Sequence, residues 1–145
     1  MSYISWHIYG YGICVSDIEV ESPDQIQELL RLAPEYEAKI RQWLEIEKIE
    51  HPTIQDYEEA DQDFLLGLAT ILKEVIEEAE GIPFTACDDF NNSDYLLYEP
   101  SYPWYRNQSE QDLTEEKVQE ILSKYVSILT NKPIAIDYYS VENGG

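Results

Sequence analysis

The segment TEEKVQEILSKYVSILTNKPIAIDYYSV, residues 114–141, joins a helical pattern directly to a strand pattern. Its first part repeats apolar residues at helical spacing, which predicts an amphipathic helix. The apolar stripe consists of Val118, Ile121, Leu122, Tyr125, Ile128 and Leu129. Thr114 is a good N-cap, and Asn131 and Pro133 end the helix. Residues 133–141 then predict a strand, and the remaining ENGG a loose tail.

A strand is also predicted at the opposite end of the chain. Over residues 3–9, Ile4, Trp6 and Ile8 fall on one side and polar or tyrosine side chains on the other. This period of two is typical of a strand. Gly10 and Gly12 follow, and they predict a bend or a bulge before the strand resumes.

Two amphipathic helices are predicted after this strand. Ser22 suits the N-cap of the first, and Pro23 suits its first helical position. Pro34 starts the second, which we expect to continue to about His51 and Pro52.

A third, long helix is predicted over residues 53–80. Its centre is apolar nearly all round and its two ends are acidic, as in a helix that is buried in the middle. Gly67 within it predicts the close approach of another backbone, and Gly81 is the expected C-terminal cap.

The order of these segments predicts the fold class. Two short strands, 83–88 and 94–98, flank the turn sequence DFNNSD and predict a β-hairpin. The whole order is β-α-α-α-β-β-α-β. Because strands and helices do not strictly alternate, this order favours an α+β fold. We expect one domain over residues 1–145, with a mainly antiparallel sheet and the helices packed on one face.

The charge of the chain restricts its partners. Asp and Glu total 30 against 9 Lys and Arg, so the formal net charge is −21. Such a protein repels nucleic acids and anionic membranes and attracts basic proteins. The simpler interpretation is that the acidity only keeps the protein soluble. No positively charged leader and no apolar run of about 20 residues is present, so we expect a soluble, cytoplasmic protein.

Motifs for catalysis or metal binding are weak. Cys14, Cys87, His7 and His51 lack the spacing of a zinc site. The cysteines are expected to be buried and inert, because an acidic chain raises the pKa of a thiol. The residues around DDFNNSD resemble a calcium loop, but they lack its glycine and final glutamate. We therefore expect no catalytic residue, metal or cofactor, and an enzyme is the less favoured interpretation.

Two groups of residues are candidates for partner binding. The stretch YLLYEPSYPWY, residues 95–105, combines aromatic rings with stiffening prolines, as interface loops do. We expect Tyr98 to point inward and Tyr102, Trp104 and Tyr105 to contact a partner. The second group is the acidic ends of the third helix, which are able to mimic the regular charges of a duplex. That group comprises Asp56, Glu59, Asp63, Glu74, Glu77 and Glu78.

Residues 84–145, together with SWHIYGYGICV near the start, resemble small acidic uncharacterised proteins of bacterial phages and prophages. No activity, cofactor or catalytic residue follows from that resemblance. Small acidic proteins of phages are often inhibitors of host defence or of host nucleic-acid enzymes.

The leading hypothesis is a non-enzymatic binding protein. It is a phage-type inhibitor that docks on a basic, nucleic-acid-binding protein and does not bind nucleic acid itself. A second hypothesis is a small-molecule or nucleotide-binding module or a cryptic enzyme, with its pocket between residues 99–113 and the strand that bears His7. A third is a structural or assembly protein that forms a homo-oligomer.

Overall fold

The computed structural model describes residues 5–60, 67–89, 93–99, 110 and 113–144, with only the backbone described at 5–7 and 143–144. Its elements are, in order, β1 (Ser5–Cys14), the short 3-10 helix η1 (Val15–Asp17), α1 (Pro23–Leu30), α2 (Pro34–Ile46), α3 (Ile54–Glu59), α4 (Leu68–Glu80), β2 (Thr85–Asp88), β3 (Asp94–Tyr98), α5 (Glu115–Leu129) and β4 (Asp137–Gly144). The predicted α+β class and element order are confirmed, except that α3 and α4 stand where one third helix was predicted.

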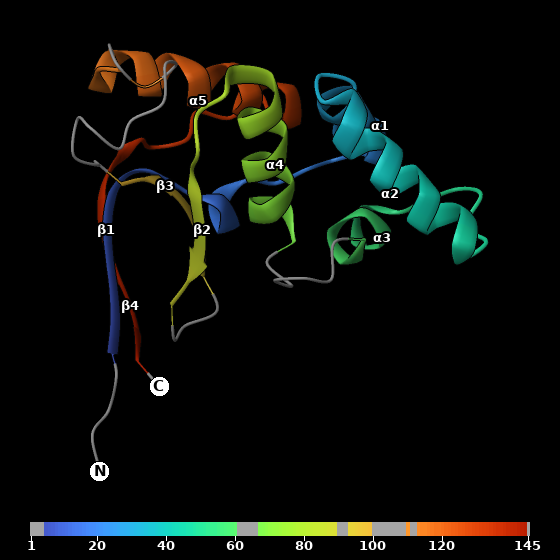
Figure 1. The fold of residues 1–145 in the computed structure, drawn as a ribbon, viewed down its shortest axis with the longest axis horizontal. Helices are drawn as coiled ribbons and strands as arrows, with labels where there is room; N and C mark the ends of the chain where they lie inside the picture. Colours follow the sequence, from blue (N-terminus) through green and yellow to red (C-terminus); the bar gives the residue numbers. More distant parts are fainter. Residues whose placement is uncertain (1–4, 61–66, 90–92, 100–109, 111–112, 145) are drawn as a thin grey trace.

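The four strands form one antiparallel sheet in the order β2-β3-β1-β4. The sheet bends into an arch, with α5 across its top and α4 beside β2 (Figure 1). The bend also brings the two edge strands β2 and β4 toward each other.

The main core lies between the sheet and the helices. Ile13 and Leu96 of the sheet and the apolar stripes of α1, α4 and α5 belong to one buried cluster. A smaller cluster on the opposite face of the sheet contains Cys87, Leu97 and Val141. The sheet therefore has apolar residues on both faces, with the helices on one of them.

Contacts between side chains fix α4 against α5. The Tyr125 hydroxyl donates a hydrogen bond to Glu80 Oε1 (3.1 Å), and Lys124 Nζ lies 3.5 Å from the same oxygen. Burial, and then the hydrogen bond to Glu80, raise the pKa of Tyr125 to about 12. The C-terminal end of α4 is thereby held over the middle of α5.

The helix caps follow the sequence closely. Ser22 accepts a hydrogen bond from the Asp24 amide and forms a capping box with Gln25, and Thr114 accepts one from the Lys117 amide. Gly81 ends α4 in the left-handed conformation, as predicted. α2 ends earlier than predicted, at Ile46, and is followed by Lys48 with a φ of 58°.

The prediction of one helix over residues 53–80 is wrong. α3 ends at Glu59, and α4 begins only at Leu68. Gly67 has φ 54° and ψ −123°, a conformation that cannot continue a helix and that strongly favours glycine. Among the described residues, the nearest atoms to a Cβ on Gly67 would belong to the Glu58 side chain, so the predicted close approach of another backbone is not found there.

Two predictions about the sheet are corrected as well. The pairing of β1 with β4 keeps one register from Ser5 to Gly12, so of the bend or bulge predicted at Gly10 and Gly12 the bulge does not form. They are instead points of close approach, because a Cβ on Gly12 would lie 2.0 Å from the Leu96 carbonyl oxygen. The tail sequence ENGG is part of β4 as far as Gly144, since β1 pairs along it.

Candidate functional site

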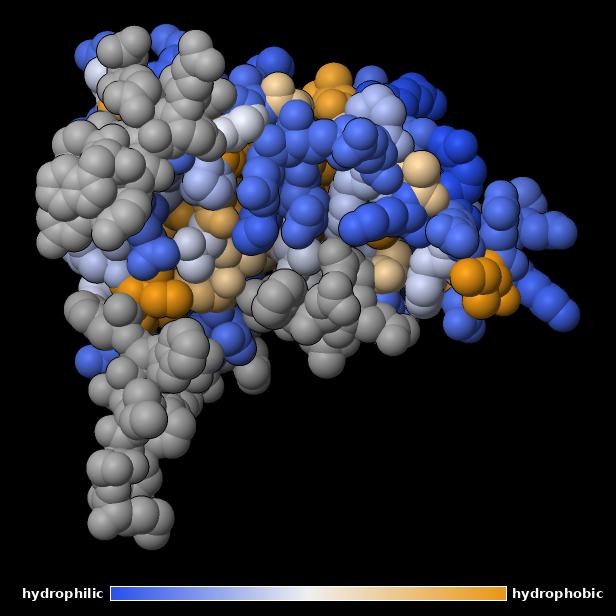
Figure 2. Space-filling view, in the orientation of Figure 1, coloured by the Kyte–Doolittle hydropathy of each residue, from blue (hydrophilic) through white to orange (hydrophobic). Residues whose placement is uncertain are grey.

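An acidic groove lies where α2 and α4 pack side by side. It has a volume of about 250 Å³, and we call it the α2–α4 groove. Its lining residues are Glu35, Tyr36 and Lys39 from α2 and Glu74, Glu77 and Glu78 from α4. Figure 2 shows a hydrophilic surface over these two helices. The groove therefore gathers three of the carboxylates that the sequence predicted for partner binding.

Glu78 has a structural role in this groove. Its two carboxylate oxygens accept hydrogen bonds from the backbone amides of Glu35 (3.0 Å) and Tyr36 (2.9 Å). Ala33, the N-cap residue of α2, has no side chain able to accept them. A carboxylate at a helix N-terminus also interacts favourably with the helix dipole. Glu78 thus acts as the cap of α2 supplied by a second helix.

The other carboxylates of the groove are partly neutralised. Lys73 Nζ lies 3.2 Å from Glu77 Oε2 and 3.6 Å from Glu74 Oε1. The four glutamates that line the groove thus have two ammonium groups beside them, those of Lys39 and Lys73. The groove keeps a net negative charge that is available to a cationic side chain from outside.

The predicted residues of α3 do not line this groove. Asp56 accepts a hydrogen bond from the Thr53 amide (2.8 Å) and completes the capping box of α3. Glu59 accepts one from Gln55 (3.0 Å). Asp63, Tyr102, Trp104 and Tyr105 lie outside the described residues.

The hairpin tyrosines behave partly as expected. Tyr98 is buried, as predicted, and its hydroxyl donates a 2.7 Å hydrogen bond to the buried Glu110. Tyr95 is half-buried and donates to Asp89 Oδ2 (3.3 Å). The pKa of Tyr95 is raised to about 12, chiefly by burial. The nearby Cys14 and Asp89 add to this increase. These rings belong to the packing of the sheet.

Both cysteines are free and buried, which confirms that part of the prediction. Burial, followed by the nearby carboxylates of Glu99 and Asp88, raises the pKa of Cys87 to about 11. The pKa of Cys14 is raised too, chiefly by burial and then by Asp17. Both groups are therefore neutral thiols near pH 7. Among the described residues, no group of three or more His, Cys, Asp or Glu is placed to hold a metal ion.

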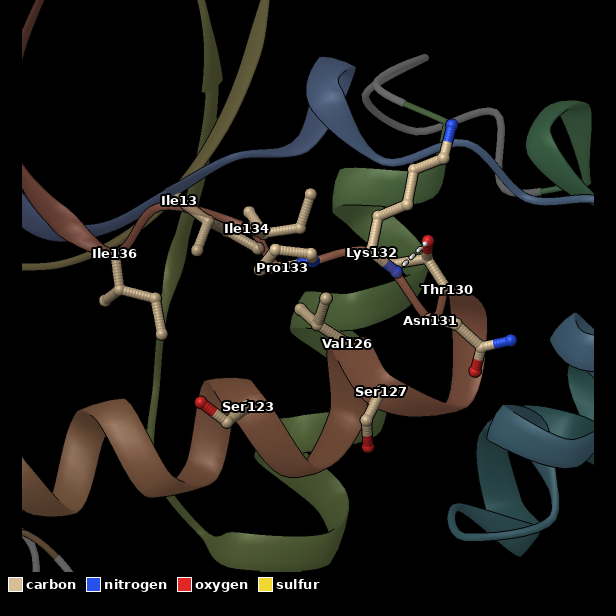
Figure 3. Close-up of a pocket in the computed structure, with 10 residues that line it drawn as sticks. All are labelled: Ile13, Ser123, Val126, Ser127, Thr130, Asn131, Lys132, Pro133, Ile134 and Ile136. Carbon is tan, nitrogen blue, oxygen red and sulfur yellow. Dashed lines mark hydrogen bonds between the residues drawn. The ribbon is translucent and has the colours of Figure 1, made fainter.

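A separate cavity of about 420 Å³ lies between α5 and the segment that leads into β4 (Figure 3). Ile13, Val126, Ile134 and Ile136 form its apolar part, and Ser123 and Ser127 border it on α5. The pocket expected near residues 99–113 and His7 falls largely outside the described residues. The cavity was not predicted, because its walls form only when residues 123–136 fold back on themselves and pack beside Ile13 of β1.

Glu35 and Lys39 of the α2–α4 groove were not among the residues predicted to bind a partner. These residues are four apart on α2 and therefore share one helix face. That spacing is visible in the sequence, but only the packing of α4 shows which face meets the predicted glutamates.

No family model, no curated protein and no solved structure matches this chain. The resemblance to small phage proteins stays a prediction. Within the described residues, no helix has both the length and the apolar character needed to cross a membrane.

Proposed function

We propose that this protein is a non-enzymatic acidic binding protein whose α2–α4 groove receives cationic side chains of a basic protein. The observation that carries this proposal is the convergence of four glutamates from two helices on one hollow. An arginine guanidinium forms paired hydrogen bonds with carboxylates, and the surrounding net charge of −21 adds attraction at longer range.

The partner that we infer is of the nucleic-acid-binding type, and occupation of its cationic surface would inhibit it, as in the phage-type hypothesis. However, exposed carboxylates occur on each of α1, α2, α3, α4 and α5 and on β4. Such a distribution favours general solubility over a duplex-like row. Specificity is therefore assigned to the groove and not to a mimic of the whole duplex.

An arginine-rich peptide tests this proposal, with a glutamine-substituted peptide of the same length as its control. We expect binding, measured by calorimetry, to weaken as salt rises from 50 to 500 mM, because salt screens exposed charges. The double variant Glu35→Gln/Glu77→Gln should weaken binding at least tenfold. The matched double variant Glu45→Gln/Glu47→Gln removes the same charge from outside the groove and should change affinity less than threefold.

Equal losses in the two double variants would show that the peptide senses net charge alone, and would refute the groove as the site. Binding that ignores salt would refute the electrostatic mechanism.

A second candidate function, a small-molecule-binding module, is favoured by the cavity beside α5. Its volume lies within the range of ligand pockets, and its lining combines apolar side chains with serine and threonine residues. A thermal-shift screen with neutral amphipathic compounds tests it, because a ligand at one hundred times its Kd adds about 2.7 kcal/mol of stability. Ser127→Trp should fill the cavity and abolish the shift, whereas Gln119→Trp on the same helix should preserve it. A flat response across the screen would exclude this candidate.

A further inference from the structure

A second hollow borders α2 on the side that faces α1 and α3. It has a volume of about 280 Å³, and we call it the arginine cavity. Leu30, Ile40 and Leu44 supply its apolar part, and each of these residues is buried. Arg31 and Arg41 line the same cavity. The cavity therefore joins an apolar surface to two guanidinium groups.

This charge is unusual for the chain. Arg31, Arg41 and Arg106 are its only arginines, so two of three line one small hollow in a protein with a net charge of −21. Glu37, which also lines the cavity, forms an ion pair with Arg41. Arg31 forms no ion pair within the part of the chain that the structure describes. Among the described residues, the cavity thus retains one cation without an ion-pair partner.

The position of Arg31 has a partial structural explanation. It follows the last residue of α1, where a positive charge interacts favourably with the helix dipole. The dipole of α1 does not explain why Arg41, on a different helix, lines the same cavity. The coincidence of both groups beside an apolar surface is what an amphipathic anion requires.

Tyr57 adds a buried polar group to the cavity wall. This residue is only 4% exposed, and its hydroxyl oxygen accepts a hydrogen bond from Gln27 Nε2 (2.9 Å). The hydroxyl hydrogen is donated to no residue that the structure describes. It is therefore able to donate a hydrogen bond to an oxygen of a ligand, as the two arginines are.

We propose that the arginine cavity binds a small organic anion, with one carboxylate or phosphate group on an apolar body. Arg31 and Arg41 hold the oxyanion, since the planar guanidinium matches the oxygens of either group. Leu30, Ile40 and Leu44 cover the apolar body. The volume equals that of roughly nine water molecules in the liquid, so the ligand is smaller than a drug-sized compound. This site is distinct from the α2–α4 groove and does not depend on the proposed function.

Three probes of similar shape test the proposal: phenylacetate, phenyl phosphate and the neutral 2-phenylethanol. We expect one or both anions to bind the wild-type protein at least tenfold more tightly than the alcohol, measured by titration calorimetry and by amide shifts in NMR spectra. The tighter anion identifies the carboxylate or the phosphate as the preferred group.

The variant Arg31→Gln should weaken anion binding at least tenfold. The NMR spectrum of the free variant should still be that of a folded protein. Lys48→Gln removes one exposed positive charge outside the cavity and should bind as the wild type does. Binding of the anions no tighter than the alcohol, equal binding by wild type and Arg31→Gln, or no binding at millimolar concentrations would each overturn the proposal. None of these results bears on the affinity of the α2–α4 groove for a basic peptide.

Discussion

The strand β1 and the helix α2 are both central to their part of the fold, but different forces determine their residues. β1 is paired on both sides, by β3 and β4, and the neighbouring backbone decides what fits there. At Gly12 even a methyl group would collide with a carbonyl oxygen. α2 is bordered instead by a hollow on each side, so its surface residues retain freedom to change. The close packing of the strands restricts which residues fit in β1, whereas the two candidate sites lie along α2.

The two hollows beside α2 also differ in charge. The α2–α4 groove gathers four glutamates, whereas the arginine cavity gathers two of the three arginines. A net charge of −21 therefore does not set the charge of each local surface. What each hollow attracts depends on which helix faces meet, since the electrostatic attraction between exposed groups falls within about 10 Å at ordinary salt.

The largest effect is expected for Gly12→Ala. Its Cβ would lie 2.0 Å from the Leu96 oxygen and 2.9 Å from the Leu97 α-carbon, so β1 and β3 would have to separate. We expect a loss of more than about 4 kcal/mol or no folded protein, measured by urea unfolding. Gly67→Ala is the comparison: among the described residues the nearest neighbour of its Cβ is the Glu58 side chain at 3.5 Å, and its strained φ should cost about 1–3 kcal/mol. A folded Gly12→Ala protein of normal stability would remove the contrast between β1 and the helical region.

A second effect in the sheet depends on pH. The pKa of the Cys87 thiol is raised from 9.0 to about 11 in the folded protein, chiefly by burial. The folded state then holds the proton more tightly, so this contribution is complete below pH 9 and is lost as pH rises toward 11. It amounts to at most about 3 kcal/mol.

Urea unfolding of the wild type and Cys87→Ala at pH 8, 9, 10 and 11 measures this contribution. The variant should lose less stability than the wild type between pH 9 and 11, whatever its stability at pH 8. Parallel curves for the two proteins would contradict the raised pKa.

A smaller effect is expected at the α2–α4 groove. Glu78→Ala removes the acceptor of two backbone amides at the start of α2, and we expect a loss of about 1–2 kcal/mol. Glu77→Ala on the same turn of α4 removes an exposed ion pair with Lys73 and should cost less than about 0.5 kcal/mol. Thermal unfolding of both variants compares them. Equal losses would show that Glu78 is no more structural than its neighbour.

A small effect is also expected where the sheet itself is exposed. Tyr9 and Tyr138 stack with ring centroids 5.6 Å apart, and 54% and 42% of these residues are exposed. Tyr138→Ser should cost about 1 kcal/mol or less, because the packing of exposed rings contributes little. Urea unfolding checks this value. A loss comparable to that of Gly12→Ala would show that the constraint on β1 extends to the surface of the sheet.

Sequence patterns predicted the elements whose signals are local. The stripe of α5, the caps Ser22 and Thr114 and the pairing of β2 with β3 were all predicted, because they depend on local spacing, on capping and on turn residues. The split of the third predicted helix was not, because an isolated glycine in an apolar helical pattern is also tolerated within a helix. Its positive φ is a property of the folded chain.

The candidate site was predicted only in part for a related reason. Glu74, Glu77 and Glu78 were recognised as one acidic helix end, but the sequence did not show that Glu78 caps α2, 42 positions away from Tyr36. Arg31 and Arg41 are ten positions apart on different elements, so no helical or strand period links them.

The sequence by itself determined the net charge, the α+β order and the apolar stripes, because these follow from composition and from the periods of helix and strand. Only the tertiary structure decided that Gly12 admits no side chain, that Glu78 completes another helix, and that α2 separates an acidic groove from an arginine cavity. Each of these features depends on the distance between groups far apart in the chain, and that distance exists only after the helices and strands have packed.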